Sequence, residues 1–142
     1  MKAITICQPY AHLIVRGAKR VENRTWPTRH RGDLVIHAGK SADWLAPDDI
    51  NDWRAAGDPL VFGAIVGWAR LVDCVQLEHV EAGRYDEKYP WLRPHEHAEG
   101  PWCWVLDAVN RFDHPIPWKG SQGMWDVRME ELVGHSFKLV TS

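Results

Sequence analysis

The chain has 142 residues, of which 45% are hydrophobic and 25% charged, and its formal net charge is −2. This length is typical of one domain and can bury a core without disulfide or metal staples. No apolar run approaches the roughly 18 to 20 residues of a membrane span, and the N-terminus lacks the long apolar region of a signal peptide. We therefore expect a single domain over residues 1–142, in the cytoplasm and without membrane contact.

The charges are unevenly distributed along the chain. Residues 1–40 carry eight Lys or Arg against two acids, a net of +6, whereas residues 41–101 carry five bases against twelve acids, a net of −7. A basic first third is typical of a surface that binds a polyanion such as a nucleic acid. The alternative is that the two segments neutralise each other across the fold.

The first half of the chain predicts strands and helices in alternation. KAITIC alternates β-branched residues and predicts a strand, and QPYAHLIVRG predicts a helix that starts near Pro9 and ends at Gly17. RVENRTW is expected to be extended, and DLVIHAG follows a turn as a strand. PDDINDWRAAG has an acidic start and a terminal Gly, which predicts a second helix.

The second half is richer in strand and turn signals. VFGAIVGWARLVDCV predicts either one coiled strand or a strongly bent pair, with Gly63 and Gly67 at bulges. The polar residues 78–100 predict a loop with a helical turn, PWCWVLDAVNRF alternates as a strand, and HPIPWKGSQG is a turn-rich segment before a last strand around MWDV. The tail after residue 128 is expected to be weakly structured.

Five or six short strands with two or three helices predict an α+β fold built on a small mixed β-barrel rather than a βαβ sheet. The strand spacing alone is equally compatible with an α+β sandwich. Of the nine tryptophans, most are expected in the core, because Trp buries a large area, and some along a cleft where bases stack.

Cysteine and histidine usage gives no metal signal. The three cysteines, Cys7, Cys74 and Cys103, are odd in number and form no CxxC pair, so neither a disulfide framework nor a zinc site is predicted. Cys7 is the one to test for reactivity. His95 and His97 lie in an acidic loop with no third ligand at a recognisable spacing. We predict no metal and no cofactor.

The stretch GAKRVENRTW, residues 17–26, concentrates charge around an aromatic side chain. Lys19 either contacts a ligand in a cleft, as a phosphate or carbonyl donor or a nucleophile, or forms an exposed pair with Glu22. Arg24 contacts a phosphate or a backbone carbonyl, or instead pairs with Glu22 and holds that side chain in place. Trp26 either stacks on a base or caps the barrel.

Further candidates lie on both sides of this stretch. Gln8 stands just before the first predicted helix, where its amide could read a base edge, and Tyr10 is placed in the same wall. His37, on a predicted strand, is either a structural histidine or a proton-transfer group. Lys40 follows that strand and is either solvated or in contact with phosphate.

These residues also carry a family resemblance. QPYAHLIVRGAKRVENRTW followed by RGDLVIHAGK resembles the ASCH domain, first described in an activating signal cointegrator. GAIVGWARLVDCV is similar to the family's central strand pair, and PIPWKGSQGMWDV to its closing segment, where Lys119, Gly120 and Trp125 match. The signature Gly-x-Lys-x-x-Glu-x-Arg is matched by Gly17, Lys19, Glu22 and Arg24.

The resemblance implies a PUA-like fold, a small pseudo-barrel with a basic cleft, and a link to RNA or modified nucleosides and in some members to DNA. Some members are amidohydrolases acting on an acylated cytidine, some are ribonucleases and some only bind. The amidohydrolases use a Lys, a Thr three residues later and a Glu on the central strand. Here Lys19 matches, Glu22 replaces the Thr and Trp68 stands near the Glu position, which argues against acyl-cytidine hydrolysis by that mechanism.

Three functions remain open from the sequence, as does the oligomeric state. The first is an RNA- or nucleoside-binding module with a basic, Trp-lined cleft. The second is a metal-independent hydrolase in which Lys19, Glu22 and His37 handle protons. The third is a protein-binding adaptor. The residues expected to contact nucleic acid are Gln8, Tyr10, Lys19, Arg24, Trp26, Lys40, Lys119 and Trp125.

Overall fold

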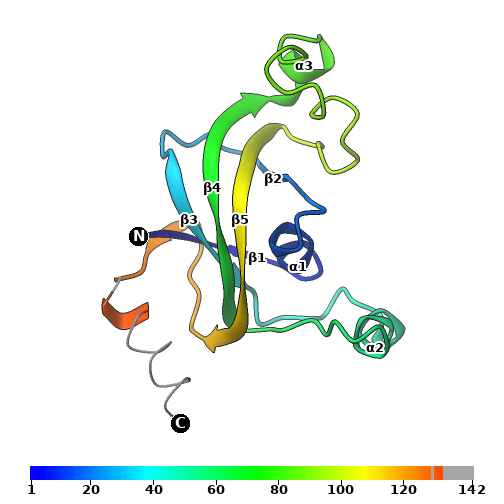
Figure 1. Cartoon of the computed structure of the whole chain (residues 1–142), viewed down its shortest axis with the longest axis vertical. Helices are drawn as coiled ribbons and strands as arrows, with labels where there is room; N and C mark the ends of the chain where they lie inside the picture. Colours follow the sequence, from blue (N-terminus) through cyan, green and yellow to red (C-terminus); the bar gives the residue numbers. More distant parts are fainter. Residues whose placement is uncertain (129, 133–142) are drawn as a thin grey trace.

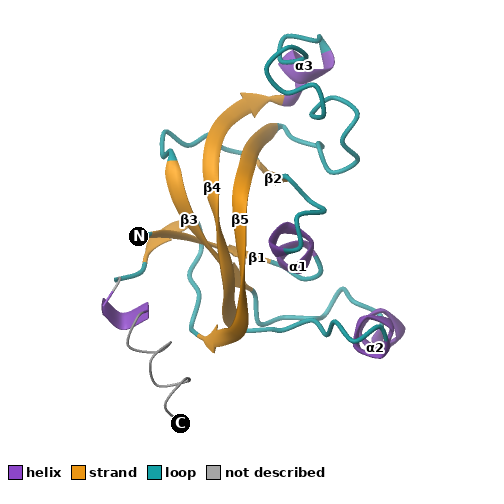
Figure 2. Cartoon of the chain, viewed as in Figure 1, coloured by secondary structure: helices purple, strands orange, loops and turns teal. Residues whose placement is uncertain are grey.

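The computed structural model describes residues 1–128 and 130–132, and the expected weakly structured tail lies almost wholly outside them. The described residues form a curled half-barrel sheet with helices around it (Figures 1 and 2). The strands are β1 (Lys2–Ile6), β2 (Val21–Arg24), β3 (Gly32–Ala38), β4 (Ala64–Gln76), β5 (Trp102–Pro117) and β6 (Met124–Asp126). The helices are α1 (Tyr10–Val15), α2 (Pro47–Ala55) and α3 (Leu77–Glu81).

The sheet is mixed, and its strand order is β2-β5-β4-β3-β1-β6. β1 and β3 run parallel, while every other neighbouring pair is antiparallel. The β4–β5 pairing shifts register at three places along its length. Such bulges increase local twist and bend strands, so they curl the sheet. The predicted α+β class with a small mixed barrel-like sheet is confirmed.

Residues 64–76 form one long strand, which decides between the two alternatives left open for this segment. Gly67 lies at a register shift, as expected, and a Cβ built there would lie 2.1 Å from the carbonyl oxygen of Asn110 on β5. No side chain fits this close approach of two backbones. Gly63 instead precedes β4, where its φ of +64° is a conformation that favours glycine.

β5 continues to Pro117 and so includes the first four residues, 114–117, of the segment that was expected to be rich in turns. β2 pairs with β5 only from Trp102 to Val105, and the later part of β5 pairs with β4 alone. Along that part, one edge of β5 has no strand partner among the described residues. Pro115 and Pro117 fit there, because proline is tolerated in a strand where no ladder hydrogen bond is required of it. The expectation of a turn from residue 114 was therefore wrong.

The main core lies on the concave side of the sheet and is covered by α1. It combines Ile4, Ile36 and Leu71 from three strands with Ile14 from the helix, all 0% exposed. α1 ends where Gly17 adopts a φ of +84°, the left-handed C-cap that the sequence predicted. The core thereby fixes the position of the residues that directly follow the helix.

The remaining helices contribute less to the core. α2, in the region where a helix was predicted, buries none of its residues and stands away from the sheet on two loops (Figure 1). α3 follows β4 at the far end of the sheet and buries Val80. None of the helices in residues 1–128 and 130–132 is long and apolar enough to cross a membrane.

Candidate functional site

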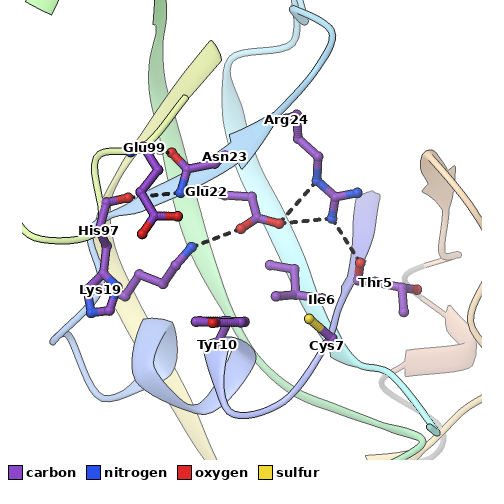
Figure 3. A pocket seen from close by; sticks show the side chains of 10 residues that line it. All are labelled: Thr5, Ile6, Cys7, Tyr10, Lys19, Glu22, Asn23, Arg24, His97 and Glu99. Atoms are coloured by element: carbon purple, nitrogen blue, oxygen red, sulfur yellow. Dashed lines mark hydrogen bonds and ion pairs between the residues drawn. The ribbon is translucent and has the colours of Figure 1, made fainter. Parts of the chain in front are cut away.

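The charge-rich stretch lines a cavity of about 430 Å³ between the end of β1, the start of α1 and β2 (Figure 3). We call it the triad pocket, after the Lys19–Glu22–Arg24 triad described below. Its lining consists of Thr5, Ile6, Cys7, Tyr10, Lys19, Glu22, Asn23, Arg24, His97 and Glu99.

Local backbone structure brings the three charged side chains together. Glu22 and Arg24 are two residues apart on β2, so both point to the same face of the strand. Lys19 precedes β2 and follows the turn at Gly17. Because it lies outside the strand, the alternation of side chains between the two faces of a strand does not fix its direction. Its side chain folds back over the strand, and its ammonium reaches Glu22, three positions away.

Glu22 is the centre of the triad. Its Oε1 accepts a hydrogen bond from Lys19 Nζ at 3.0 Å, and its Oε2 accepts from Arg24 Nε at 3.1 Å. Lys19 also donates to the Val21 carbonyl at 2.7 Å, and Arg24 Nη2 donates to the Thr5 carbonyl at 2.9 Å. The Lys19 and Glu22 side chains are only 4% and 8% exposed. Buried charges require such pairing, so this is not the exposed ion pair of the alternative interpretation.

Tyr10 is the exposed aromatic side chain of the triad pocket. The residue is 41% exposed, and its ring centre lies 5.5 Å from Lys19 Nζ. Trp26 is half-buried and packs edge-on against Trp104 of the main core, with ring centres 4.9 Å apart. None of the described tryptophans lines this pocket, so the expectation of a Trp-lined cleft is wrong for the triad pocket.

Asn23 connects the triad to the opposite wall. Its Nδ2 donates to the His97 carbonyl at 2.8 Å, and its Oδ1 accepts from the backbone N–H groups of Glu99 and Gly100 at 3.0 and 2.7 Å. These bonds place Glu99 at the rim of the pocket, on the side of Asn23 and His97 (Figure 3). A second carboxylate therefore joins Glu22 there.

His95 and His97, the two histidines of the acidic loop, lie close to each other. The rings of His95 and His97 lie 5.6 Å apart, and His95 Nε2 accepts the backbone N–H of Arg20 at 3.1 Å. Burial, with a smaller contribution from His97, lowers the pKa of His95. Within residues 1–128 and 130–132, no group of three His, Cys, Asp or Glu side chains is arranged to hold a metal ion.

Gln8 does not line the triad pocket. It is 0% exposed, its Nε2 donates to the Val61 carbonyl at 2.8 Å, and its Oε1 accepts the backbone N–H of His12 at 2.9 Å. Both ends of the amide are thus engaged within the fold. Gln8 holds the start of α1 against the loop that precedes β4.

His37, Lys40, Lys119 and Trp125 gather elsewhere, around a second cavity of about 670 Å³. We call it the second cavity. The structure therefore does not bring His37 together with Lys19 and Glu22. Trp125 contacts His37 from outside the lining. The lining consists of Thr5, His37, Lys40, Gly63, Trp118, Lys119, Gly120, Ser121 and Gln122.

The His37 ring is fixed by two hydrogen bonds. Its Nε2 lies 2.7 Å from the Trp118 carbonyl, which can only accept, so Nε2 carries a proton. Its Nδ1 lies 3.2 Å from Thr5 Oγ1, which also accepts from Trp125 Nε1 at 3.2 Å. Burial lowers the pKa of His37. A neutral His37 accepts the Thr5 hydroxyl proton at Nδ1, so both ring nitrogens are occupied.

Cys7, which the sequence marked for a reactivity test, lines the triad pocket. Partial burial and, next, the charge of Glu22 raise the pKa of its thiol. Thr5, Asn23 and Glu99 were not predicted as site residues. Asn23 could have been found from its place inside the charged stretch. Glu99 could not, because only the hydrogen bonds of Asn23 bring it there.

Comparison with known proteins identifies relatives of this chain. The family model described as "ASCH domain" matches residues 4–115. The human protein "Activating signal cointegrator 1" is 28% identical over 133 residues, covering 86% of this chain and 21% of the relative, and the mouse protein of the same name is 28% identical over 134 residues. The chain thus spans about a fifth of the length of these relatives.

Solved structures agree on the fold. The crystal structure of ASCH from Zymomonas mobilis aligns over 99% of this chain and 93% of that chain, with a TM-score of 0.56 and 18% identity. A single-residue variant of the same protein aligns over 99% and 96%, with a TM-score of 0.53 and 19% identity.

Proposed function

Since the chain belongs to the ASCH domain family and is thus a nucleic-acid-associated module, we propose that it binds RNA by holding one nucleoside unit in the triad pocket. The observation that carries this proposal is the Lys19–Glu22–Arg24 triad, in a cavity of about 430 Å³ beside the exposed ring of Tyr10; the Lys19 and Glu22 members are buried. This volume falls within the usual size range of small-molecule sites.

The chemistry of the pocket suits a base better than a phosphate. Glu22 offsets one of its two cationic neighbours, and Glu99 adds a second carboxylate at the rim. Carboxylate oxygens have about four lone-pair sites in total. Glu22 can therefore accept further hydrogen bonds from amino or ring N–H groups of a base, while Tyr10 offers a face for stacking, worth about 1 to 3 kcal/mol per base.

Metal-independent hydrolysis of RNA or of a modified nucleoside is the second candidate. Its supporting observation is the 3.0 Å contact between Lys19 Nζ and Glu22 Oε1, a distance at which a proton can be transferred. Lys19 would act as a nucleophile only after losing that proton. Since its ammonium is held by both Glu22 and the Val21 carbonyl, binding is the better-supported function.

The test is a titration of fluorescein-labelled random RNA hexamers, followed by anisotropy. We expect salt-dependent binding that Tyr10→Ala weakens roughly tenfold and Tyr10→Phe preserves, because Phe keeps the stacking face. The absence of binding by the wild-type protein at low salt would overturn the proposal. Gel analysis of the same samples tests the second candidate: cleavage that disappears in Lys19→Met would favour hydrolysis.

A further inference from the structure

The second cavity differs from the triad pocket in its charge. Lys40 and Lys119 line it, and its lining includes no carboxylate from the described residues. The triad pocket combines two cations with the carboxylates of Glu22 and Glu99. The second cavity therefore attracts an anionic group. The triad pocket instead suits an uncharged hydrogen-bond donor.

The two lysines of the second cavity are available for a ligand. Both are exposed, and neither forms a hydrogen bond or an ion pair with any residue in the described part of the chain. Lys19, by contrast, has two partners within 3.0 Å. Free ammonium groups on flexible stems are common phosphate ligands.

The wall that carries Lys119 is attached firmly to the sheet. Trp118 donates its backbone N–H to the Gly63 carbonyl at 3.1 Å, and its carbonyl accepts from His37 at 2.7 Å. A Cβ built on Gly120 would lie 2.6 Å from His37 Cε1 and 2.6 Å from Thr5 Oγ1. The backbone at Gly120 thus lies directly on the imidazole, and this contact places Lys119 beside the cavity.

The backbone of residues 119–122 adds further donors. Their N–H groups make no hydrogen bond with any acceptor in residues 1–128 and 130–132. Successive free N–H groups in a turn-rich segment are typical ligands of anions. Residues 119–122 all line the second cavity, so these groups lie in the same wall as Lys119.

Thr5 connects the two cavities. Its carbonyl oxygen accepts from Arg24 in the triad pocket, while its hydroxyl bonds to His37 at the second cavity. Figure 3 shows the carbonyl directed at Arg24 and the side chain turned away from the triad. The two cavities therefore meet at Thr5, which lines both of them.

We propose that the second cavity binds a phosphate group of the RNA whose nucleoside occupies the triad pocket, with Lys40 and Lys119 as its ligands. This assignment rests on the proposed function, because it concerns the same bound strand. It divides the recognition of one ligand between a carboxylate-containing pocket for the base and a cationic cavity for the backbone.

The test compares two double variants that remove equal charge. Lys40→Gln/Lys119→Gln removes the two lysines of the cavity, whereas Arg54→Gln/Arg70→Gln removes two exposed cations that do not line it. With the random RNA hexamer, we expect the lysine variant to bind about tenfold more weakly. The slope of log K against log salt should fall by about 0.7 for each lost phosphate contact. The arginine variant should keep the wild-type affinity and slope. Equal affinities and slopes for the lysine variant and the wild type would overturn the assignment.

A second measurement keeps the two proposals apart. In an ¹⁵N–¹H correlation spectrum, uridine 5′-monophosphate should shift the amide signals of Gly63 and Gly120, whereas uridine should not. If hexamers do not bind but the monophosphate shifts these signals, the RNA-binding proposal fails and the cavity is a site for free nucleotides. If hexamers bind and Tyr10→Ala weakens them while Gly63 and Gly120 stay unshifted with every ligand, only the phosphate assignment fails.

Discussion

Lys19 and Glu22 form a 3.0 Å ion pair that is almost completely withdrawn from solvent, with side chains 4% and 8% exposed. Arg24 approaches the other carboxylate oxygen of Glu22 and is 23% exposed. One carboxylate thus compensates two cations. The pocket's stability depends on Glu22 more than on either of its partners.

The first prediction follows from this asymmetry. Glu22→Gln leaves both Lys19 and Arg24 without a counter-charge, and we expect it to lower the free energy of unfolding by roughly 3 kcal/mol, as when a buried pair is broken. Lys19→Met should cost less, because Glu22 keeps Arg24. Urea denaturation checks both values. Lys2→Ala, which breaks the exposed Lys2–Asp126 pair, is the control and should change stability much less. A greater loss in Lys19→Met than in Glu22→Gln would contradict the account.

The second prediction concerns Cys7. Burial and the negative charge of Glu22 raise the pKa of its thiol, so the native protein should react slowly with iodoacetamide at pH 8, and faster as the pH rises. Glu22→Gln removes one of these two causes, and we expect Cys7 to react several-fold faster, because the thiolate is the reactive form.

The measurement uses a Cys74→Ser/Cys103→Ser background, so that only Cys7 is alkylated. Burial raises the pKa of Cys103 to about 11. The Cys103 thiol should therefore be inert in the folded protein, even in variants that keep this cysteine. A Cys7 rate unaffected by Glu22→Gln would show that the carboxylate does not act on the thiol. Bound RNA should also protect Cys7, which would place the ligand in the triad pocket.

The third prediction is a pH dependence of stability. Burial lowers the pKa of His37 in the folded state below its ordinary value of 6.5. Between these two pKa values the unfolded chain binds more protons, so the free energy of unfolding should fall as the pH drops below about 7. The contribution of neutral His37 to the free energy of unfolding is complete above the pKa that the histidine has in the unfolded chain.

Urea denaturation from pH 8 to pH 5 measures this slope. His37→Gln should be less stable at pH 8, since it loses the bonds to Trp118 and Thr5, but its stability should depend less on pH. His95, whose pKa is also lowered, should account for part of the remaining slope. His114→Gln changes an exposed histidine and should leave the slope as in the wild type. Identical slopes for His37→Gln and wild type would contradict the prediction.

The fourth prediction tests the contact between Gly120 and His37. Gly120→Ala places a methyl group 2.6 Å from the imidazole and from the Thr5 hydroxyl, so the 118–122 backbone must move away. We expect a loss of about 1 to 3 kcal/mol, typical of overpacking, and a weakened His37–Trp118 hydrogen bond, visible as a shifted His37 ring signal by NMR. Gly39→Ala is a matched control, because its nearest neighbour would lie at 3.6 Å. Equal stabilities of the two variants would refute the close contact.

Local sequence patterns predicted much of the fold. The β-branched alternation in residues 2–6, the Pro9 start and Gly17 end of the first helix, and the acidic start of the second are all short-range signals, and the corresponding elements are present. The length of β5 was not predictable in this way. Pro115 is a local turn signal. It is compatible with a strand only because this part of β5 pairs on one edge, which depends on the tertiary structure.

The candidate site was predictable in part for the same reason. Lys19, Glu22 and Arg24 lie within six positions, so their clustering was visible in the sequence. The packing of Gln8 and Trp26 depends on partners far along the chain, the loop at Val61 and the core residue Trp104. The separation of His37 from Lys19 into another cavity depends on the parallel pairing of β1 with β3, which no local pattern encodes.

The order of the strands also bears on how the protein behaves at high concentration. Among the described residues, the sheet ends at β2 and β6, which have four and three residues, and the part of the 16-residue β5 beyond Val105 has one edge without a strand partner. Long unpaired edges act as templates for strand addition from other molecules, and short edge strands limit such association. Pro115 and Pro117 lie on the unpaired part of β5 and have no N–H group to donate to an added strand, so they and the short end strands limit association through the sheet edges.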